Sequence, residues 1–343
     1  MVSLKAIRES NVRVATSLPP GLVAVFVGAT SGIGETTLKH FAKQARKPRI
    51  YFLGRRESEG QRIQAALKEL NPDGEYHYLK YDVSLIKNVD EVCRYIQGRE
   101  ETINLLFLTS GTLTTGKHTT EDLHYPIALG YYCRMRFIAN LLPQIRRAPG
   151  LRRVVTVLSG GKEGKVFTDD LHGNRVSIMS LRGHIASITT IALSALAKCA
   201  PEVSFIHAFP GFVKTDLARE FTGLGATILK AIATPIFACI PSIPIDESGE
   251  RHLYLATSAR FPPRDGKGGD AGAVALGAGI GLAVGADGNI GGGVYSIDPE
   301  AEGTSQKVQD LMERFAKDKT AEDVWKKTEA EYLRIAGGLS AIN

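Results

Sequence analysis

Cysteine is scarce in this sequence: the 343 residues include only Cys93, Cys133, Cys199 and Cys239. The four lie far apart, no two have the short spacing of metal ligands, and each has apolar or helical neighbours. These features exclude a disulfide-stapled fold and a zinc ribbon. We expect four reduced thiols in a reducing compartment, which predicts a cytoplasmic protein.

Long uninterrupted hydrophobic runs are also missing. Residues 1–21 contain no apolar core of the length that a signal peptide needs. The most hydrophobic later stretch, residues 223–245, is interrupted by Lys230, Pro235 and Pro241, whereas a membrane-spanning helix needs about 20 predominantly apolar residues. We therefore expect no transmembrane segment and interpret residues 217–245 as a lid over a bound substrate.

A concentrated basic surface is the third absence. The formal net charge is +6, but the basic residues occur in short pairs such as Arg146-Arg147 and Arg152-Arg153, with acidic residues between the pairs. The sequence has no basic stripe and no basic motif interleaved with aromatic residues. We therefore expect no nucleic-acid partner.

The sequence does contain a regular alternation of strand and helix patterns over residues 21–211. Short continuous apolar runs such as "VAVFV" are typical of strands buried on both faces, and the segments between them have helical periodicity. The expected strands span residues 21–30, 49–54, 75–83, 103–111, 152–161 and 203–211, and the expected helices residues 31–46, 57–72, 84–100, 123–147 and 178–199. This order predicts an α/β fold with a doubly wound parallel sheet.

The pattern loosens after Lys214. The lid is followed by a glycine-rich segment, residues 263–293, a last strand, residues 293–298, and an amphipathic helical pair, residues 305–337. We expect a single domain over residues 21–300, preceded by an N-terminal extension, residues 1–20, and followed by a C-terminal helical extension, residues 301–343.

A glycine pattern follows the first expected strand. Gly28, Gly32 and Gly34 lie between this strand and the next helix, together with Ser31 and Ile33. Glycines at such a turn let the backbone approach a pyrophosphate, which then sits at the N-terminus of the helix. The position after the first strand of a βαβ unit predicts a Rossmann-type dinucleotide site.

The end of the second expected strand indicates which dinucleotide is bound. An acidic residue there would bind the ribose 2′-hydroxyl of NAD, but the strand ends in Gly54, Arg55 and Arg56. The arginine fork suits a 2′-phosphate. We therefore expect NADP(H), with a solvated basic turn as the alternative interpretation of Arg55 and Arg56.

Taken together, these motifs resemble the short-chain dehydrogenase/reductase family, and most of all its fungal members from secondary-metabolite pathways. The resemblance covers about residues 21–215. It rests on the glycine pattern, Asp82-Val83 after the third strand, "SGG" at residues 159–161 after the fifth strand, and "PGFVKT" at residues 210–215 after the sixth strand.

The resemblance implies further cofactor contacts. Asp82 would hold the adenine amino group with Val83 packed nearby, and Thr215 would contact the nicotinamide carboxamide beyond the turn at Pro210-Gly211. The family's Asn-Asn-Ala-Gly after the fourth strand is replaced by "LTSG". The small residues Ser110 and Gly111 keep only its turn-forming character.

The catalytic positions that the resemblance implies depart from the family pattern. Ser159 matches the serine that binds the substrate oxygen, but Gly130 occupies the place of the family's asparagine. Counting back from Pro210 places Ser180 and His184 in the slot of the Tyr-x-x-x-Lys pair. The sequence has no tyrosine between Tyr132 and Tyr254, so a shifted alignment does not restore the usual acid.

Ser180 and His184 are one helical turn apart and can face the same cleft. A serine hydroxyl is a weak acid, whereas an imidazole, with an ordinary pKa near 6.5, can donate or accept a proton. For His184 we keep three interpretations: a catalytic residue, a ribose-binding residue, or a buried structural residue. Tyr125, Tyr131 and Tyr132 are further donors that the neighbouring helix could supply.

Three functions remain open at this stage. The first is an NADP(H)-dependent reductase acting on a carbonyl, enone or iminium of an apolar secondary metabolite, polyketide or terpenoid-like. The second is a redox-neutral cyclase, isomerase or dehydratase on the same scaffold, and the third is a non-catalytic binding protein. The resemblance also implies a homodimer that pairs through the helices after strands four and five.

Overall fold

Seven strands form one parallel sheet in the computed structural model, which describes residues 1–215, 242–266 and 272–337. The strand order is β3-β2-β1-β4-β5-β6-β7, so the chain reverses its direction of growth between β1 and β4. The strands are β1 (Val23–Val27), β2 (Arg49–Gly54), β3 (Glu75–Lys80), β4 (Leu105–Leu108), β5 (Arg153–Val157), β6 (Ser204–Ala208) and β7 (Val294–Ile297).

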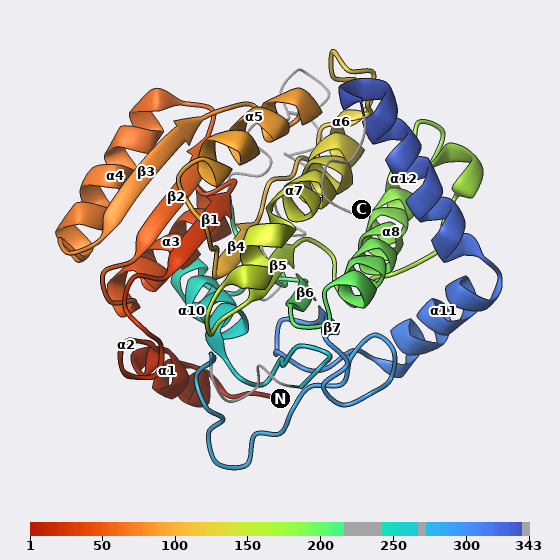
Figure 1. Cartoon of the computed structure of the whole chain (residues 1–343). Helices are drawn as coiled ribbons and strands as arrows, with labels where there is room; N and C mark the ends of the chain where they lie inside the picture. Colours follow the sequence, from red (N-terminus) through yellow and green to blue (C-terminus); the bar gives the residue numbers. More distant parts are fainter. Residues whose placement is uncertain (216–241, 267–271, 338–343) are drawn as a thin grey trace.

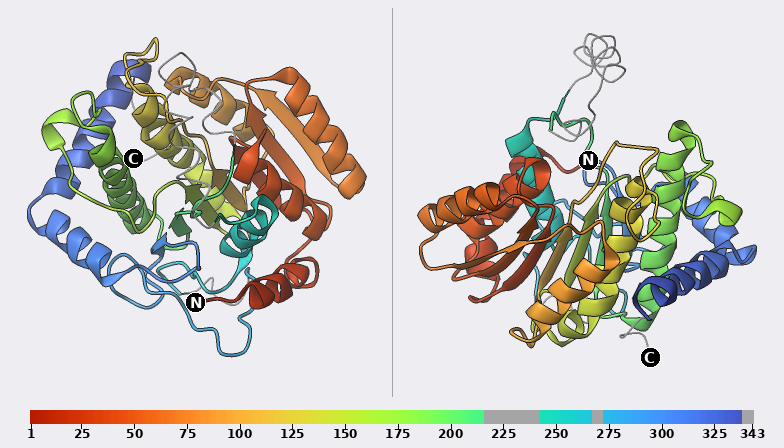
Figure 2. Two further views of the ribbon diagram at one scale, coloured as in Figure 1. Left: turned by 180° about the vertical axis from the view of Figure 1, so that it is seen from behind. Right: turned by 90° about the horizontal axis from the view of Figure 1, so that it is seen from above.

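Helices cover both faces of this sheet (Figures 1 and 2). One face carries α1 (Leu4–Val12), α3 (Gly32–Gln44), α4 (Glu57–Leu70) and α10 (Ile245–Thr257), with the short α2 (Val14–Ser17) after α1. The other face carries α5 (Ile86–Gln97), α7 (Cys133–Arg147), α8 (Ile178–Cys199), α11 (Gln306–Lys317) and α12 (Thr320–Ala336). The short elements α6 (Tyr125–Ile127), η1 (Ala128–Tyr132) and η2 (Thr168–Asp170) lie in the connections.

The apolar runs of the sequence become strands because each strand packs against both helix layers. In β1 the side chains of Val23, Val25 and Val27 join one core cluster, whereas Ala24 and Phe26 join the other. All five residues of β1 are buried. Two-sided burial is the reason that this strand reads as a continuous hydrophobic run.

The expected doubly wound parallel sheet is confirmed, and so are the last strand and the C-terminal helical pair. One expected helix, residues 123–147, is divided, because a π-helical turn over Ala128–Tyr132 separates α6 from α7. Most of the expected lid lies outside the described residues. Its last residue, Ile245, belongs to α10 instead.

Helix α10 was not predicted, although its sequence carries a start signal. Pro244 is its N-cap residue, and Asp246 and Glu247 lie in its first turn. Leu253, which is buried, belongs to the core cluster on the face that carries α3. The interpretation of residues 217–245 as a lid placed this start signal in an irregular segment.

Both ends of the described chain pack onto the sheet domain. The single Nε–H of Arg8 in α1 is shared between the two carboxylate oxygens of Glu250 in α10, each at 2.9 Å, and the Asn11 side chain donates to the Glu250 carbonyl oxygen at 2.9 Å. At the other end, α12 packs against α5 and α8. We propose that residues 1–20 and 301–343 are additions to a single domain of residues 21–300.

Among the described residues, no helix combines the length and the apolar character that crossing a bilayer requires.

Candidate nucleotide and substrate site

The glycine loop lies at the carboxyl end of β1, beside the point where the strand order reverses. In open α/β sheets, ligands bind in the crevice at this place. Gly28 has φ of +81°, and a Cβ atom added to it would lie 2.7 Å from the backbone nitrogen of Ser110, which follows β4. The two strand ends therefore approach each other as closely as glycine allows, and the structure brings Gly28 and Ser110 together.

The other two positions of the loop favour glycine for different reasons, a close contact at Gly34 and a positive φ at Gly32. A Cβ atom on Gly34 would lie 2.4 Å from the carbonyl oxygen of Gly28, which excludes any larger residue. Gly32 has φ of +58° and faces Thr215, whose Cβ would be 3.4 Å from an added methyl group. Thr215, far away in the sequence, therefore lies over the glycine loop. Ser31 is the N-cap residue of α3, but its hydroxyl makes no capping hydrogen bond.

This geometry suits a phosphate group. The first backbone N–H groups of a helix have no partner within the helix, and the helix dipole favours negative charge there. With the Ser31 hydroxyl not used as a cap, the N-terminus of α3 around Ile33 is open for that role. The loop can therefore hold the pyrophosphate of a dinucleotide.

Contacts at the end of β2 explain why no acidic side chain stands there. A Cβ atom on Gly54 would lie 2.1 Å from the Thr30 side chain. The Arg55 Nη1 atom donates a hydrogen bond to the Tyr125 hydroxyl at 3.1 Å, which steers the guanidinium toward α6. Arg56 is exposed and forms the N-cap of α4. This edge of the site therefore carries two adjacent basic residues directly after the strand.

Asp82 and Val83 follow β3 at the same edge of the sheet. One Asp82 carboxylate oxygen, Oδ1, accepts the backbone N–H of Ser84 at 3.0 Å, and the Asp82 carbonyl oxygen accepts a hydrogen bond from the Asn88 side chain at 2.9 Å. These contacts hold the loop in one conformation. Val83 is buried, as a packing role requires.

A buried arginine that the motifs of the sequence do not include lies beneath Ser110 and Gly111. Arg134 of α7 is fully buried, and no carboxylate forms an ion pair with it among the described residues. Burial lowers the pKa of Arg134 to about 10. Its guanidinium donates to the backbone oxygens of Leu108, Ser110, Leu129 and Val157 and to the Thr156 hydroxyl. It therefore ties the ends of β4 and β5 together under the site.

A π-helical turn contains the position of the family's asparagine. Gly130 lies in the middle of η1, and a Cβ atom on it would lie 3.4 Å from the Ile185 side chain of α8, which is ordinary van der Waals contact. The side chains of α8 therefore pack directly against this position. The Leu129 carbonyl oxygen accepts hydrogen bonds from Arg134 Nε at 3.2 Å and from Cys133 Sγ at 3.1 Å. Arg134 follows a stretch of apolar residues, and this isolated charge was the available sequence signal of a buried hydrogen-bond centre.

Ser159 follows β5 directly and is buried. Its backbone N–H donates to Nε2 of His207 at 3.3 Å. A Cβ atom on Gly160 would lie 2.1 Å from the His207 carbonyl oxygen, so the turn after Ser159 requires glycine. The structure therefore places Ser159 at the carboxyl edge of the sheet, between the ends of β4 and β6.

A buried polar network supports this turn. The Glu163 carboxylate accepts hydrogen bonds from the hydroxyls of Thr190 at 2.7 Å and Ser296 at 2.6 Å. The Thr190 hydroxyl lies 2.9 Å from Nδ1 of His207, whose other ring nitrogen faces Ser159. Burial raises the pKa of Glu163, but the His207 ring and the two hydroxyls outweigh it and hold the pKa below its usual range.

The two residues of the Tyr-x-x-x-Lys slot point to different surroundings. Ser180 is exposed, and its hydroxyl accepts a hydrogen bond from the Ser177 hydroxyl at 3.1 Å. His184 is fully buried, with Nδ1 accepting the Phe167 backbone N–H at 3.3 Å and Nε2 lying 3.1 Å from the Leu171 carbonyl oxygen. Burial lowers the pKa of His184, and because Nδ1 accepts a hydrogen bond, the ring proton lies on Nε2.

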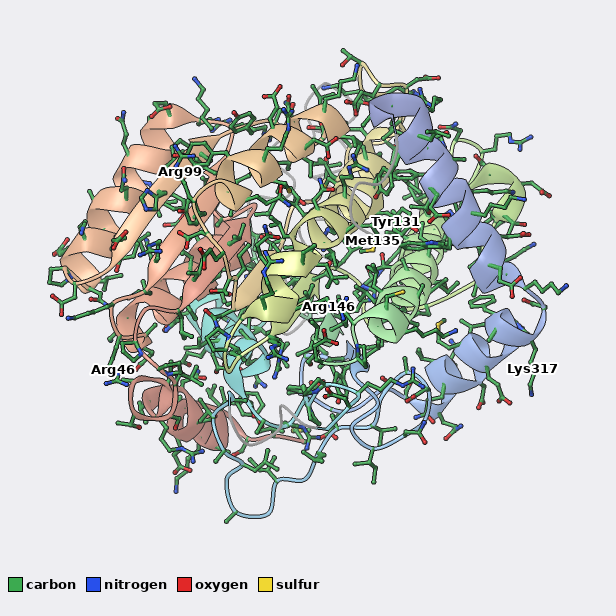
Figure 3. All side chains as sticks on the ribbon, in the orientation of Figure 1. Arg46, Arg99, Tyr131, Met135, Arg146 and Lys317 are labelled. Carbon is green, nitrogen blue, oxygen red and sulfur yellow. The ribbon has the colours of Figure 1, made fainter. Side chains whose placement is uncertain are left out.

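The tyrosines of the neighbouring helix are not available at the slot. Tyr131 and Tyr132 are fully buried, and the Tyr131 hydroxyl lies 2.7 Å from the Thr328 hydroxyl of α12. Figure 3 shows Tyr131 among the helices α7, α8 and α12. Burial raises the pKa of both phenols. Tyr125 lies beside Arg55 instead.

A cavity of ≈ 280 Å³ lies beside the start of α8. His118 and His124 contribute to its wall, and Nε2 of His118 lies 2.9 Å from the Asn174 side-chain oxygen. Val176, Ile178 and Leu181 supply apolar lining. This is a partly apolar space next to the segment that the sequence analysis aligned with the Tyr-x-x-x-Lys pair.

Comparison with known proteins gives consistent matches. The family model described as short chain dehydrogenase matches residues 22–162. The chain is 36% identical to "Oxidoreductase andH" of Emericella variicolor, over 98% of each chain. It is 33% identical to the "NmrA-like family domain-containing oxidoreductase notO" of Aspergillus sp., over 98% of this chain and 96% of that one.

Solved structures share the fold. A 3-oxoacyl (acyl-carrier-protein) reductase from Agrobacterium tumefaciens C58, solved with NADP bound, superposes with a TM-score of 0.54 at 16% identity, covering 71% of this chain and 91% of that one. The Pseudomonas aeruginosa RhlG/NADP complex has a TM-score of 0.54 at 15% identity, covering 78% and 98%.

Proposed function

The chain belongs to the short-chain dehydrogenase family, and from that premise we propose that it is an NADP(H)-dependent oxidoreductase that reduces a carbonyl, enone or iminium of an apolar metabolite. The observation that carries the proposal is the glycine loop. Gly28 and Gly34 have contacts that exclude a Cβ atom, and Gly32 has a positive φ that favours glycine, at the place in the sheet where open α/β folds bind a dinucleotide.

The choice of NADP(H) over NAD(H) rests on the end of β2. Gly54 packs against Thr30 and leaves no room for a carboxylate, while Arg55 and Arg56 stand directly after it. A planar guanidinium binds a phosphate with two parallel hydrogen bonds. The structures with bound NADP that share the fold support the same choice.

When bound, NADPH would supply the hydride. The N-terminus of α3 would hold the pyrophosphate, Arg55 the 2′-phosphate and Asp82 the adenine amino group, and Thr215 would contact the carboxamide across Gly32. Ser159 would donate a hydrogen bond to the substrate oxygen. Its backbone is fixed by His207, which limits how far its hydroxyl can move.

The missing tyrosine supports the proposed substrate class. Loss of general-acid help costs a factor of about 10² to 10⁴ in rate. Ser180 is a weak acid, and both ring nitrogens of His184 are occupied by backbone groups. A substrate whose developing negative charge is delocalised, such as an enone, needs less help from an acid. The role that the geometry supports for His184 is to position the segment from Phe167 to Leu171.

The second function is a redox-neutral cyclase, isomerase or dehydratase. Only one observation favours it: the segment of Ser180 and His184 lacks the tyrosine that usually donates the proton. The two functions differ in whether nicotinamide absorbance at 340 nm changes with turnover. Consumption of NADPH supports the first, and conversion without consumption supports the second.

We further propose a cytoplasmic location and retain the homodimer with one restriction. Cys93, Cys133 and Cys199 are free thiols, which fits a reducing compartment, while Cys239 lies outside the described residues. The helices after β4 and β5 are α7 and α8, and α12 packs over them within the same chain. A homodimer would therefore use another surface.

Calorimetric titration with NADPH and NADH tests the cofactor. We expect micromolar binding of NADPH and weak binding of NADH by the wild-type protein. Arg55→Ala should weaken NADPH binding about tenfold, the effect of losing about 1.4 kcal/mol, and NADH binding much less. Arg99→Ala is the matched control, since Arg99 is exposed and lies over the Tyr95 ring at 3.6 Å, after α5 (Figure 3). Equal losses for the two nucleotides would contradict the phosphate assignment.

A further inference from the structure

Two basic side chains meet around one aromatic ring at the carboxyl ends of β5 and β6. The Lys162 Nζ atom lies 5.2 Å from the centre of the Phe209 ring, and the Arg182 Cζ atom lies 4.6 Å from it. Lys162 follows the turn after β5, and Phe209 follows β6 directly. Arg182 stands inside the Tyr-x-x-x-Lys slot, between Ser180 and His184.

A contact between two glycines brings these cations together. A Cβ atom on Gly164 would lie 3.3 Å from Cα of Gly183, and one on Gly183 would lie 3.5 Å from the Lys162 carbonyl oxygen. The Gly164 N–H also donates to the Gly183 carbonyl oxygen at 3.1 Å. The start of α8 thus lies directly on the loop after β5. The slot therefore presents Arg182 toward the end of β6, while His184 points into the loop around Leu171.

Among the residues that the structure describes, neither cation has an acidic partner. Within the described part of the chain, no carboxylate forms an ion pair or a hydrogen bond with the side chains of Lys162 or Arg182. Glu163 is turned into the core, where Thr190 and Ser296 bind it. Asp298, after β7, feels the charge of Lys162, but its Oδ1 atom accepts the backbone N–H groups of Glu300 and Glu302.

The arrangement of the two cations suits an anionic ligand. Lys162 and Arg182 are both exposed to solvent, and like charges that share one site repel each other. Burial lowers the pKa of Arg182, although much of its side chain remains accessible. An anion bound between the two cations would relieve the repulsion, and Phe209, which is half-buried, would contact an apolar or aromatic part of the same molecule.

We propose that Lys162, Arg182 and Phe209 form an anion subsite that binds a carboxylate group of the substrate. This subsite rests on the proposed function, because it assumes that a largely apolar substrate with one carboxylate group binds beside Ser159. The backbone N–H of Lys162 donates to the Ser159 carbonyl oxygen at 3.1 Å, so the subsite and the serine belong to one turn. A carboxylate held there would orient the reacting carbon near the end of β5.

The experiment uses 1-naphthoate and its neutral analogue 1-naphthamide as probes. Each is titrated calorimetrically into the full-length protein, with and without saturating NADPH. We expect naphthoate to bind at least about tenfold more tightly than the amide, the ratio for an added charge-assisted contact. Raising the salt concentration should weaken the binding of naphthoate but not of the amide.

Three variants locate the binding. Lys162→Gln and Arg182→Gln should each weaken naphthoate binding about tenfold and leave amide binding unchanged. Lys165→Gln is the matched control, since Lys165 is exposed and its Nζ atom lies 5.0 Å from another ring, that of Phe167, without a second cation. It should bind naphthoate as the wild type does. Circular dichroism of each variant checks that it is folded.

The remaining outcomes separate the alternatives. Equal binding of acid and amide, or no binding of either, would overturn the subsite. If the Lys162 and Arg182 variants lose NADPH affinity and keep naphthoate affinity, the cations bind a cofactor phosphate and the proposal is wrong. If the wild type binds naphthoate but not NADPH, the subsite stands and the proposed cofactor fails.

Discussion

Single residues decide the shape of the nucleotide loop, and the decisive atoms belong to the backbone. The neighbours that exclude a side chain at Gly28 and Gly34 are the backbone of Ser110 and the carbonyl oxygen of Gly28 itself. A backbone cannot rotate away as a flexible side chain can. A side chain at Gly28 must therefore move the end of β4 relative to the end of β1.

Gly28→Ala and Gly21→Ala form a matched pair that tests this. The two glycines have nearly the same φ, +81° and +80°, but Gly21 has no atom within 4 Å of an added Cβ. Gly21→Ala should cost only the left-handed strain, about 1–2 kcal/mol of unfolding free energy. Gly28→Ala should cost about 1–3 kcal/mol more, from overpacking, and should also abolish nucleotide binding. Urea unfolding and calorimetry measure both effects, and equal costs with intact binding would refute the contact argument.

The elements above and below the sheet carry buried titratable groups that the site does not use. His252 of α10 is buried. Its Nδ1 atom lies 2.6 Å from the Ser248 carbonyl oxygen, and its ring packs edge-to-face against Phe107 of β4. Burial lowers the pKa of His252 to about 4. Its Nε2 atom has no hydrogen-bond partner in the described part of the chain, so an N–H group formed there by protonation would have no acceptor.

This geometry predicts a loss of stability in acid. The unfolded chain protonates His252 near pH 6.5, whereas the folded protein does so only near pH 4, so the unfolded state binds more protons between these values. The contribution is fully present above pH 6.5 and is lost as the pH falls toward 4, by about 3 kcal/mol. Urea unfolding at pH 7.5 and 4.5 measures it.

His252→Leu, which cannot titrate, is the comparison. Its unfolding free energy should fall less than that of the wild type between the two pH values. If the two proteins lose the same amount, His252 is not the group that titrates.

At the scale of the whole molecule, the C-terminal helix α12 completes the core on one face of the sheet (Figure 1). Tyr332 is buried, donates its hydroxyl proton to the Tyr132 carbonyl oxygen at 2.6 Å and lies under the guanidinium of Arg136 at 5.1 Å. Its burial is compensated by one hydrogen bond and by contacts with aromatic and cationic groups. The C-terminal segment is therefore part of the folded unit.

Tyr332→Ala should lower the free energy of unfolding by about 3–5 kcal/mol, the usual cost of emptying a large buried aromatic site. Leu333→Ala is the control, because the next side chain along α12 is 64% exposed and its loss should change stability by no more than about 0.5 kcal/mol. Chemical denaturation of both variants provides the comparison. Similar costs would mean that α12 is only loosely attached.

Local patterns in the sequence were sufficient to determine the sheet, the helices between its strands, the glycine loop and the basic end of β2. Apolar runs and helical periodicity report burial on two faces or one, and a glycine between a strand and a helix reports a tight turn. Helix α10 escaped because its start signal, Pro244 and Asp246, lies among irregular segments.

Only the tertiary structure decided which side chains face one another at the carboxyl ends of the strands. The spacing of Ser180 and His184 put both in one cleft, but the loop around Leu171 covers His184, and Arg182 faces Phe209 instead. The backbone partners of Arg134, the Glu163 network and the cover that α12 places over α7 were likewise not predictable. Each depends on contacts between segments far apart in the chain, and no local pattern records such a contact.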